Sequence, residues 1–394
     1  MISNNGKTQK VYYWSPFISR VATVRAVIRS AESLKKYSKN AYEPYIINSV
    51  GEWFEYESEL KDKNIKLINF SKSNLIKNKQ YQGYINSRLL YWYIFFKTFF
   101  PLLNLIKKNP PKFLIIHLMT SLPLLLNLLK KFNTHIILRI SGFPKLNLFR
   151  KQLWKITLKK VFLVTTPTVG TLEYINSLKM IKKEKVKLLR DPVISCKEVR
   201  LKKKEENELN KNDFKNYFIS IGRLTKQKNF LFLIDCFSDL IKRKKNYKLV
   251  IIGEGEHRLE IEKKIYSNNL KNNIILLGYK ENIFKYLKDA RAFLLTSLWE
   301  DPGFVLVESA YCNIPIISSD CKNGPEEFLN YGKGGMLFKS NSKISFLSKI
   351  QEFENINKSL LEQFLLNSKQ TSRNFTIFHH FKTLFELLNY ENNN

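Results

Sequence analysis

The sequence has 394 residues, a formal net charge of +32 and 44% hydrophobic residues. This length suggests two or three domains, and the hydrophobic content is sufficient for buried cores, which excludes a disordered basic tail. Four scattered cysteines without a C-x-x-C pair exclude a disulfide scaffold and a cysteine zinc site, and the five scattered histidines form no H-E-x-x-H motif. The first residues lack the apolar core of a signal peptide, so we expect a cytoplasmic protein.

The first half of the sequence alternates strand-like apolar runs with helical stretches. Strands are expected at residues 10–16, 43–50, 64–70, 112–118, 135–141 and 161–167, and a helix at 20–38. The last three of these runs are short and continuously apolar, which is typical of parallel strands that are buried on both faces. This order of elements predicts a doubly wound α/β domain.

The most apolar run, residues 89–106, has about the length of a transmembrane candidate. Lys97, Pro101 and Asn104 interrupt it, and Pro101 would kink a helix at this point. We therefore expect a core or interfacial helix, and no membrane-spanning helix.

The composition changes after residue 195. Residues 196–216 are charged and nearly free of large apolar side chains, so we expect a linker there. A second series of buried-strand patterns follows at residues 217–222, 248–253, 273–278, 291–296 and 314–318. The sequence thus predicts two α/β domains in tandem, at residues 1–195 and 217–372.

The positive charge is concentrated in the first half. Residues 1–200 carry a net charge of +25 and residues 201–394 a net charge of +7. Residues 63–172 contain 19 Lys and Arg, no acidic residue and many aromatic side chains. Such a field attracts a polyanion, and the candidates are nucleic acid, an anionic bilayer or a phosphate-bearing substrate. The alternative is a solvated basic face without a partner.

Open α/β sheets bind ligands beyond the carboxyl ends of their strands, so the residues that follow each strand are the candidates for a site. In the second domain Gly222 permits a sharp turn after the first strand. Arg223 and Lys228 then place two cations near the strand end, which suits a diphosphate. The alternative is an ordinary surface loop.

The segment after residues 291–296 predicts a helix that begins in the sequence DPG. Its first amides would face the ligand and favour a phosphate: Gly303, Phe304 and Val305. Glu300 precedes this helix and Glu308 lies inside it. A carboxylate in an apolar helix is costly to bury unpaired, and sugar hydroxyls would satisfy it. The alternative is one glutamate at a helix start and one bonded to backbone in the core.

Three segments, GRLTKQKN, EDPGFVLVE and SSDCKNGPEEFL, together resemble the donor-binding domain of GT-B glycosyltransferases of the family-four, or group 1, type, over residues 217–338. The resemblance implies two Rossmann-like domains that face each other across a cleft, and a final helix at 373–394 that returns to the first domain. It also implies roles for individual residues: Arg223 and Lys228 on the nucleotide diphosphate, Glu308 on the ribose, Glu300 on the transferred sugar, the amides of Gly303–Val305 on phosphate and sugar, and Glu327 near the donor.

The same resemblance implies a retaining glycosyltransferase. No D-x-D motif is present, so we expect a metal-independent enzyme with no cofactor beyond its nucleotide-sugar co-substrate. The segment SDCKNGPEE is similar to members that use UDP-sugars. The implied acceptor is a lipid-linked saccharide or lipopolysaccharide precursor, which the basic first domain would meet at the inner face of the membrane.

The first domain departs from the family pattern. Many relatives carry a glycine-rich loop after the first strand, where this sequence has Trp14-Ser15-Pro16, and Ser15 is the candidate acceptor contact. His117 matches the position of a histidine near the reacting centre in relatives, and the alternative is a satisfied strand-end histidine. Arg139 would meet an acceptor phosphate. We thus expect Glu300, His117, Arg223 and Lys228 to carry catalysis.

Two other functions stay open. A nucleotide-sugar epimerase is suggested by the changed loop in the first domain. A nucleic-acid-binding protein is suggested by charge alone, but no such motif is present and the segments at 217–338 would be unexplained, so we expect no nucleic acid partner.

Overall fold

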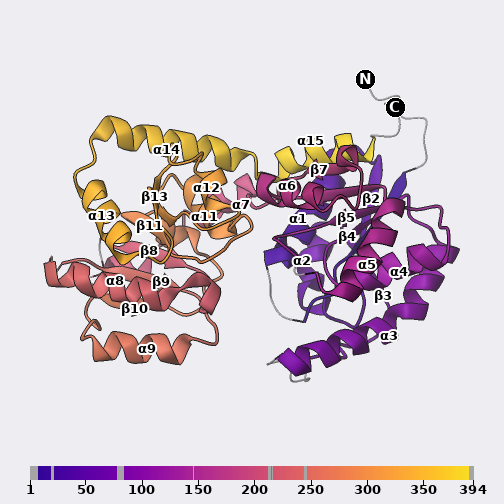
Figure 1. The fold of residues 1–394 in the computed structure, drawn as a ribbon, viewed down its shortest axis with the longest axis horizontal. Helices are drawn as coiled ribbons and strands as arrows, with labels where there is room; N and C mark the ends of the chain where they lie inside the picture. Colours follow the sequence, from indigo (N-terminus) through magenta and orange to yellow (C-terminus); the bar gives the residue numbers. More distant parts are fainter. Residues whose placement is uncertain are drawn as a thin grey trace. The chain divides into compact units, whose positions relative to one another are not determined.

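A computed structural model describes residues 8–18, 22–77, 84–144, 146–211, 214, 216–243 and 246–389. The chain divides into two compact units, the first formed by residues 1–192 and 377–394 and the second by residues 193–376. Each unit contains one parallel β-sheet with helices packed on it (Figure 1).

The first unit is built on a seven-stranded sheet in the order β3-β2-β1-β4-β5-β6-β7. Its strands are β1 (Gln9–Trp14), β2 (Tyr42–Asn48), β3 (Lys66–Asn69), β4 (Phe113–Ile116), β5 (His135–Arg139), β6 (Leu163–Thr166) and β7 (Val186–Leu188). Its helices are α1 (Ala22–Tyr37), α2 (Glu57–Asp62), α3 (Tyr84–Lys108), α4 (Ser121–Leu129), α5 (Leu148–Thr157), α6 (Val169–Ser177) and α15 (Ile377–Leu388). The strand order reverses between β1 and β4, and that reversal defines the crevice where such sheets bind ligands.

The second unit repeats this plan with six strands in the order β10-β9-β8-β11-β12-β13. The strands are β8 (Phe218–Ile221), β9 (Leu249–Ile252), β10 (Ile274–Leu276), β11 (Ala292–Leu295), β12 (Ile316–Ser319) and β13 (Met336–Phe338). The helices are α7 (Cys196–Lys202), α8 (Phe230–Arg243), α9 (Arg258–Ser267), α10 (Phe284–Leu287), α11 (Phe304–Tyr311), α12 (Pro325–Phe328), α13 (Lys343–Glu354) and α14 (Lys358–Arg373). Here the order reverses between β8 and β11.

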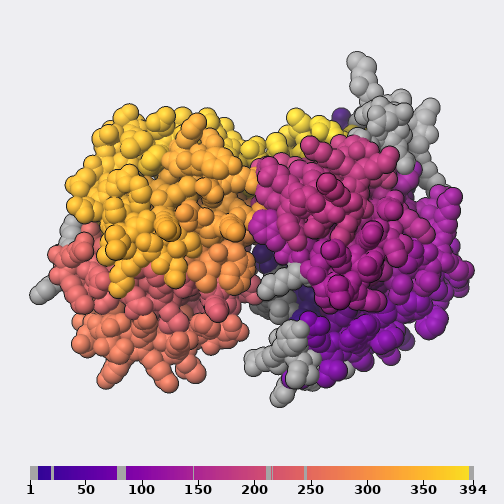
Figure 2. Space-filling view, in the orientation of Figure 1, coloured from indigo at the N-terminus to yellow at the C-terminus, as the bar shows by residue number. Residues whose placement is uncertain are grey.

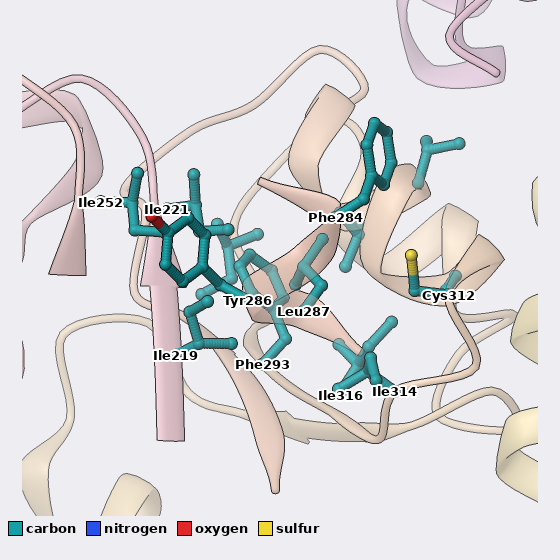
Figure 3. Packing of buried hydrophobic residues seen from close by; sticks show 14 of the residues in the cluster. Ile219, Ile221, Ile252, Phe284, Tyr286, Leu287, Phe293, Cys312, Ile314 and Ile316 are labelled. Atoms are coloured by element: carbon teal, nitrogen blue, oxygen red, sulfur yellow. The ribbon is translucent and has the colours of Figure 1, made fainter. Parts of the chain in front are cut away.

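Alternate residues of these strands fill two apolar layers, one on each face of the second sheet, because successive strand side chains point to opposite faces. Ile219 and Phe293 belong to the layer drawn in Figure 3, and their neighbours Phe218 and Leu294 belong to the layer on the other face. Strands buried on both sides need apolar residues at every position. This explains why the continuous apolar runs predicted the sheets, and the predicted α/β class is confirmed.

Two short strands escaped prediction, and the predicted linker is wrong. β7 and β13 have three residues each, too few to give a pattern. Within 196–216 the structure has α7, whose Val199 is 2% exposed, and Leu209, also 2% exposed, and both join the core of the second unit. Asn207 donates to the Tyr217 hydroxyl at 2.9 Å. A few apolar anchors therefore hold a segment whose average composition is charged. Residues 212, 213 and 215 of the predicted linker lie outside the described residues.

The last helix, α15, packs against α1 within the first unit. His380 of α15 joins Ser30 of α1 through Nε2 and Oγ at 2.8 Å, and its Nδ1 lies 2.7 Å from the carbonyl oxygen of Arg190. The hydroxyl of Tyr13 in β1 completes this buried chain at 2.9 Å from Ser30 Oγ. Burial lowers the pKa of His380 to about 4, so the imidazole is neutral. Residues 390–394 of the predicted final helix lie outside the described residues.

Helix α3 runs through Pro101 and lies on the outer surface of its unit, where Figure 2 shows it in purple. Only 28% of its most apolar 18-residue window is buried. By length and composition alone, residues 86–108 pass the test for a membrane-spanning helix, which the core helix of a soluble protein can also pass. Our expectation of a core or interfacial helix at 89–106 therefore stays a prediction.

Candidate active site

Lys228 and Glu300 form a buried ion pair where the strand order of the second sheet reverses. Lys228 follows β8 and Glu300 follows β11. Lys228 Nζ contacts Glu300 Oε1, and the side chains are 13% and 5% exposed. Ser297 donates to the same carboxylate oxygen at 2.6 Å. A pair this buried depends on both partners, because removal of one leaves an uncompensated charge.

Two glycines lie directly against this pair. A Cβ at Gly222 would sit 3.1 Å from Cε of Lys228, and a Cβ at Gly303 would sit 3.4 Å from the carboxyl carbon of Glu300. Gly303 also has a φ of 92°, a left-handed conformation that favours glycine. A Cβ at Gly222 would press on the Lys228 side chain, and the left-handed backbone at Gly303 disfavours a side chain, so both positions beside the pair favour glycine.

The helix α11 begins directly after Gly303, its N-cap residue, beside Glu300. The amides of the first helical turn, including those of Phe304 and Val305, have no acceptor within the helix, so this end favours an anion. Glu308 lies further along the helix and is half-buried. Arg223 is exposed in the loop after β8. The end of this sheet therefore offers an exposed cation, a paired cation and a helix N-terminus.

A third loop, after β12, packs onto the first two. Asn323 donates to Asp301 Oδ1 at 2.9 Å, and a Cβ at Gly324 would lie 2.6 Å from the carbonyl oxygen of Pro302. This contact brings α12, which carries the half-buried Glu327, to the loop that holds Glu300. The structure thus gathers the predicted donor residues at the carboxyl ends of β8, β11 and β12. Lys228 is paired with Glu300, and the contact of Arg223 and Lys228 with a diphosphate stays a prediction.

In the first unit, Ser15 and His117 lie on the two strands where the order of the first sheet reverses. Ser15 follows β1 and is fully buried, and His117 follows β4 and donates its backbone N–H to the Trp14 carbonyl at 2.9 Å. Burial, with smaller contributions from Arg139 and His380, lowers the pKa of His117 well below its ordinary value. The imidazole is therefore neutral at physiological pH, the form able to accept a proton.

Arg139, the predicted acceptor contact, is paired in the structure. It is 6% exposed and forms a two-point ion pair with Asp191, in which Nε donates to Oδ1 at 3.0 Å and Nη2 contacts Oδ2, while Nη1 contacts Ser141 Oγ. The pairing fixes the guanidinium at the end of β5, and its contact with an acceptor phosphate stays a prediction.

A cavity of about 830 Å³ in the first unit is lined partly by residues that the sequence motifs did not assign to a site. His117, Arg139 and Ser141 line it together with residues from α3 and α5, among them Trp92, Phe96, Arg150 and Trp154. The spacing of aromatic residues in 91–100 was the available signal. That spacing fits a core helix equally well, so the facing helix was needed to identify the cavity.

The fold of both units is that of the GT-B glycosyltransferases. The structure of Alr3699/HepE from Anabaena, in complex with UDP and glucose, superposes with a TM-score of 0.69 at 13% sequence identity, covering 96% of this chain and 99% of that protein. The predicted GT-B fold is thereby confirmed.

Residues 202–371 match the family model "Glycosyl transferases group 1", which confirms the predicted resemblance of the second unit. The chain is 40% identical to an uncharacterized glycosyltransferase of Methanocaldococcus jannaschii over 34% of this chain and 36% of that protein. It is 31% identical to the GalNAc-alpha-(1->4)-GalNAc-alpha-(1->3)-diNAcBac-PP-undecaprenol alpha-1,4-N-acetyl-D-galactosaminyltransferase of Campylobacter jejuni, over 50% of this chain and 52% of that protein. The chain thus spans about a third to a half of the length of these curated relatives.

Proposed function

We propose that this protein is a retaining, metal-independent glycosyltransferase that moves a sugar from a UDP-sugar to a lipid-linked or lipopolysaccharide-type saccharide at the cytoplasmic face of a membrane. The observation that carries the proposal is the buried pair of Lys228 and Glu300, which adjoins Gly222, Gly303 and the N-terminus of α11 at the reversal of the second sheet. The group 1 match over the same residues supports the reaction class.

The geometry suggests how these groups act on a donor. The departing diphosphate gains negative charge in the transition state, and Arg223, Lys228 and the first amides of α11 would stabilise it. When a diphosphate takes Lys228, Glu300 loses its partner, and hydroxyls of the transferred sugar would replace it. Glu308 would bind the ribose. The proposed roles of Lys228 and Glu300 start from the ion pair that they form, and that of the amides from their place at the N-terminus of α11.

The acceptor class rests on two lines of support. The Campylobacter relative is named for an undecaprenol-diphosphate substrate. The acid-free segment 63–172 includes α3, whose apolar face is exposed beside basic residues. Neutral His117, at the reversal of the first sheet, would meet the acceptor hydroxyl there, whereas Ser15 is fully buried.

The test is a thermal-shift panel of UDP, GDP and UDP-sugars, followed by transfer of radiolabelled sugar to a polyprenyl-diphosphate saccharide. Specific stabilisation by a UDP-sugar is expected, because a ligand that binds only the folded state raises its stability. Consumption of donor without acceptor indicates the epimerase alternative. Failure of every nucleotide to raise the melting temperature contradicts the proposal.

A further inference from the structure

The cavity of the first unit has apolar walls and a polar end. Its walls come from one face of α3 and one face of α5, as the three- and four-residue spacing of the lining positions shows: Arg88, Tyr91, Trp92, Phe95, Phe96 and, on α5, Phe149, Arg150, Leu153 and Trp154. The polar end is formed by His117, Arg139 and Ser141, which follow β4 and β5. A molecule that fills this cavity must therefore be largely apolar, with polar groups where it meets the end near His117 or the two arginines of the walls.

The cavity is continuous with an exposed apolar surface. Trp92, Phe96 and Phe149 line it and are nevertheless 50%, 68% and 73% exposed. The same helices expose Phe100 and Leu148 beyond the cavity, at 68% and 84%. Exposed apolar patches of this kind mark sites that bind an apolar partner. An apolar chain can thus pass from the surface into the cavity without crossing a polar barrier.

The charges at the cavity fit an anion. None of the described residues that line the cavity is acidic. Two arginines, Arg88 and Arg150, line its walls. The Arg150 guanidinium lies 5.1 Å from the centre of the Trp154 ring, which holds it beside the apolar wall. The volume of about 830 Å³ lies within the roughly 300–1,000 Å³ of small-molecule sites. Apolar walls with cationic side chains are complementary to an amphiphile that carries a phosphate.

We propose that this cavity binds the hydrocarbon chain of the lipid-phosphate acceptor itself, with the phosphate at Arg88 and Arg150. The inference rests on the proposed transfer to a lipid-linked acceptor, and it names the part of that acceptor that the first unit recognises. The apolar walls of the cavity fit a single hydrocarbon chain, and the two arginines on those walls, Arg88 and Arg150, fit its phosphate.

The experiment titrates the full-length protein with farnesyl phosphate by calorimetry, below the concentration at which the lipid forms micelles. Farnesol carries the chain alone and inorganic phosphate carries the charge alone. Farnesyl phosphate is expected to bind at least about tenfold more tightly than either. Equal affinity for farnesol and farnesyl phosphate, or for inorganic phosphate and farnesyl phosphate, overturns the proposal, as does the absence of binding.

A matched pair of variants locates the chain. Phe96 and Phe100 lie one turn apart on α3 and are equally exposed, at 68%, but Phe96 lines the cavity and Phe100 is not among its lining residues. Phe96→Ala should weaken farnesyl phosphate binding about tenfold, which corresponds to 1.4 kcal/mol, whereas Phe100→Ala should change it less than about twofold. Equal losses place the lipid on the open surface and refute the cavity.

UDP titrations of the same proteins separate this inference from the proposed function. UDP binding that is preserved in both variants shows that the second unit is intact. If no nucleotide binds while the Phe96 and Phe100 variants still differ as expected, the proposed function fails and the cavity assignment stands.

Discussion

Replacing Glu300 by glutamine should affect UDP binding and sugar transfer in opposite directions. Lys228 is held by Glu300, so a diphosphate that binds Lys228 must displace a charged partner. Glutamine keeps the size of the side chain and an oxygen that can accept from Lys228 and Ser297, but it removes the negative charge. The competition for Lys228 is therefore weaker in Glu300→Gln.

The expected magnitude follows from the charge that the substitution removes. Lys228 stays charged in Glu300→Gln, so its hydrogen bond to the glutamine oxygen falls at the lower end of the roughly 1.5–3 kcal/mol of bonds that involve a charged group, and the ion pair lies at the upper end. The interaction to be displaced thus weakens by about 1 kcal/mol, which makes UDP binding about fivefold tighter. Transfer should instead fall about tenfold or more, because the charged contact of Glu300 with the transferred sugar is lost in the transition state.

Calorimetric titration with UDP and a steady-state transfer assay measure the two effects. Glu308→Gln is the matched control, since the proposed loss of a ribose contact weakens UDP binding. In a Lys228→Met background, Glu300→Gln should no longer tighten UDP, because the competition acts through Lys228. If Glu300→Gln weakens UDP as much as Glu308→Gln does, the proposed roles of the two glutamates are wrong.

Three further predictions address other parts of the molecule. Arg223→Ala and Lys228→Ala should each weaken UDP binding by roughly 1.5–3 kcal/mol in calorimetry, and unchanged affinity in both would remove them from the donor site. In liposome sedimentation the protein should bind anionic vesicles more strongly than neutral ones. Salt should release part of the bound protein, and Phe100→Asp should release more. Equal binding to both kinds of vesicle at low salt contradicts an electrostatic contribution to membrane binding. For His380, the pKa is about 4 in the folded state and near 6.5 when unfolded, so its stabilising contribution is complete above pH 6.5 and is lost as the pH falls towards 4. The difference in unfolding free energy between the unsubstituted protein and His380→Gln should shrink over this range, because the titration of other buried groups is common to both proteins and cancels. A constant difference refutes the lowered pKa of His380.

The sequence predicted the residues of the candidate site but not their partners. Gly222, Lys228 and Glu300 were identified because each follows a buried strand, and parallel strands bring their carboxyl ends to one edge. The ion pair joins residues 72 positions apart, and no local pattern encodes such a contact. Arg139 shows the same limit, since its partner Asp191 follows β7, a strand of three residues without a readable pattern.

The first unit was harder to predict because its cavity depends on two helices at once. Aromatic residues in α3 repeat with a helical spacing, but that spacing is the same whether the face contacts a core, a membrane or a ligand. The position of α5 opposite α3 decides between them, and it is set by the tertiary packing of both helices on the sheet. The short helix α7 was missed for a related reason, since a single buried valine anchors it among charged neighbours.

The buried pair also bears on how an intact donor differs from its product. Glu300 is 6% exposed, so its carboxylate is costly to leave without a partner once a diphosphate takes Lys228. The sugar of a UDP-sugar supplies hydroxyls that can replace Lys228 as donors to Glu300. UDP lacks this sugar, so Glu300 keeps the hydrogen bond from Ser297 without such a replacement. UDP-sugar should therefore bind the unsubstituted protein about tenfold more tightly than UDP. One hydrogen bond to a charged group contributes roughly 1.5 kcal/mol, which produces this ratio. The difference in affinity would favour release of UDP after transfer. The ratio should approach one in Glu300→Gln, where no charge is left uncompensated. Equal affinities for UDP and UDP-sugar in the unsubstituted protein would show that Glu300 does not contact the sugar.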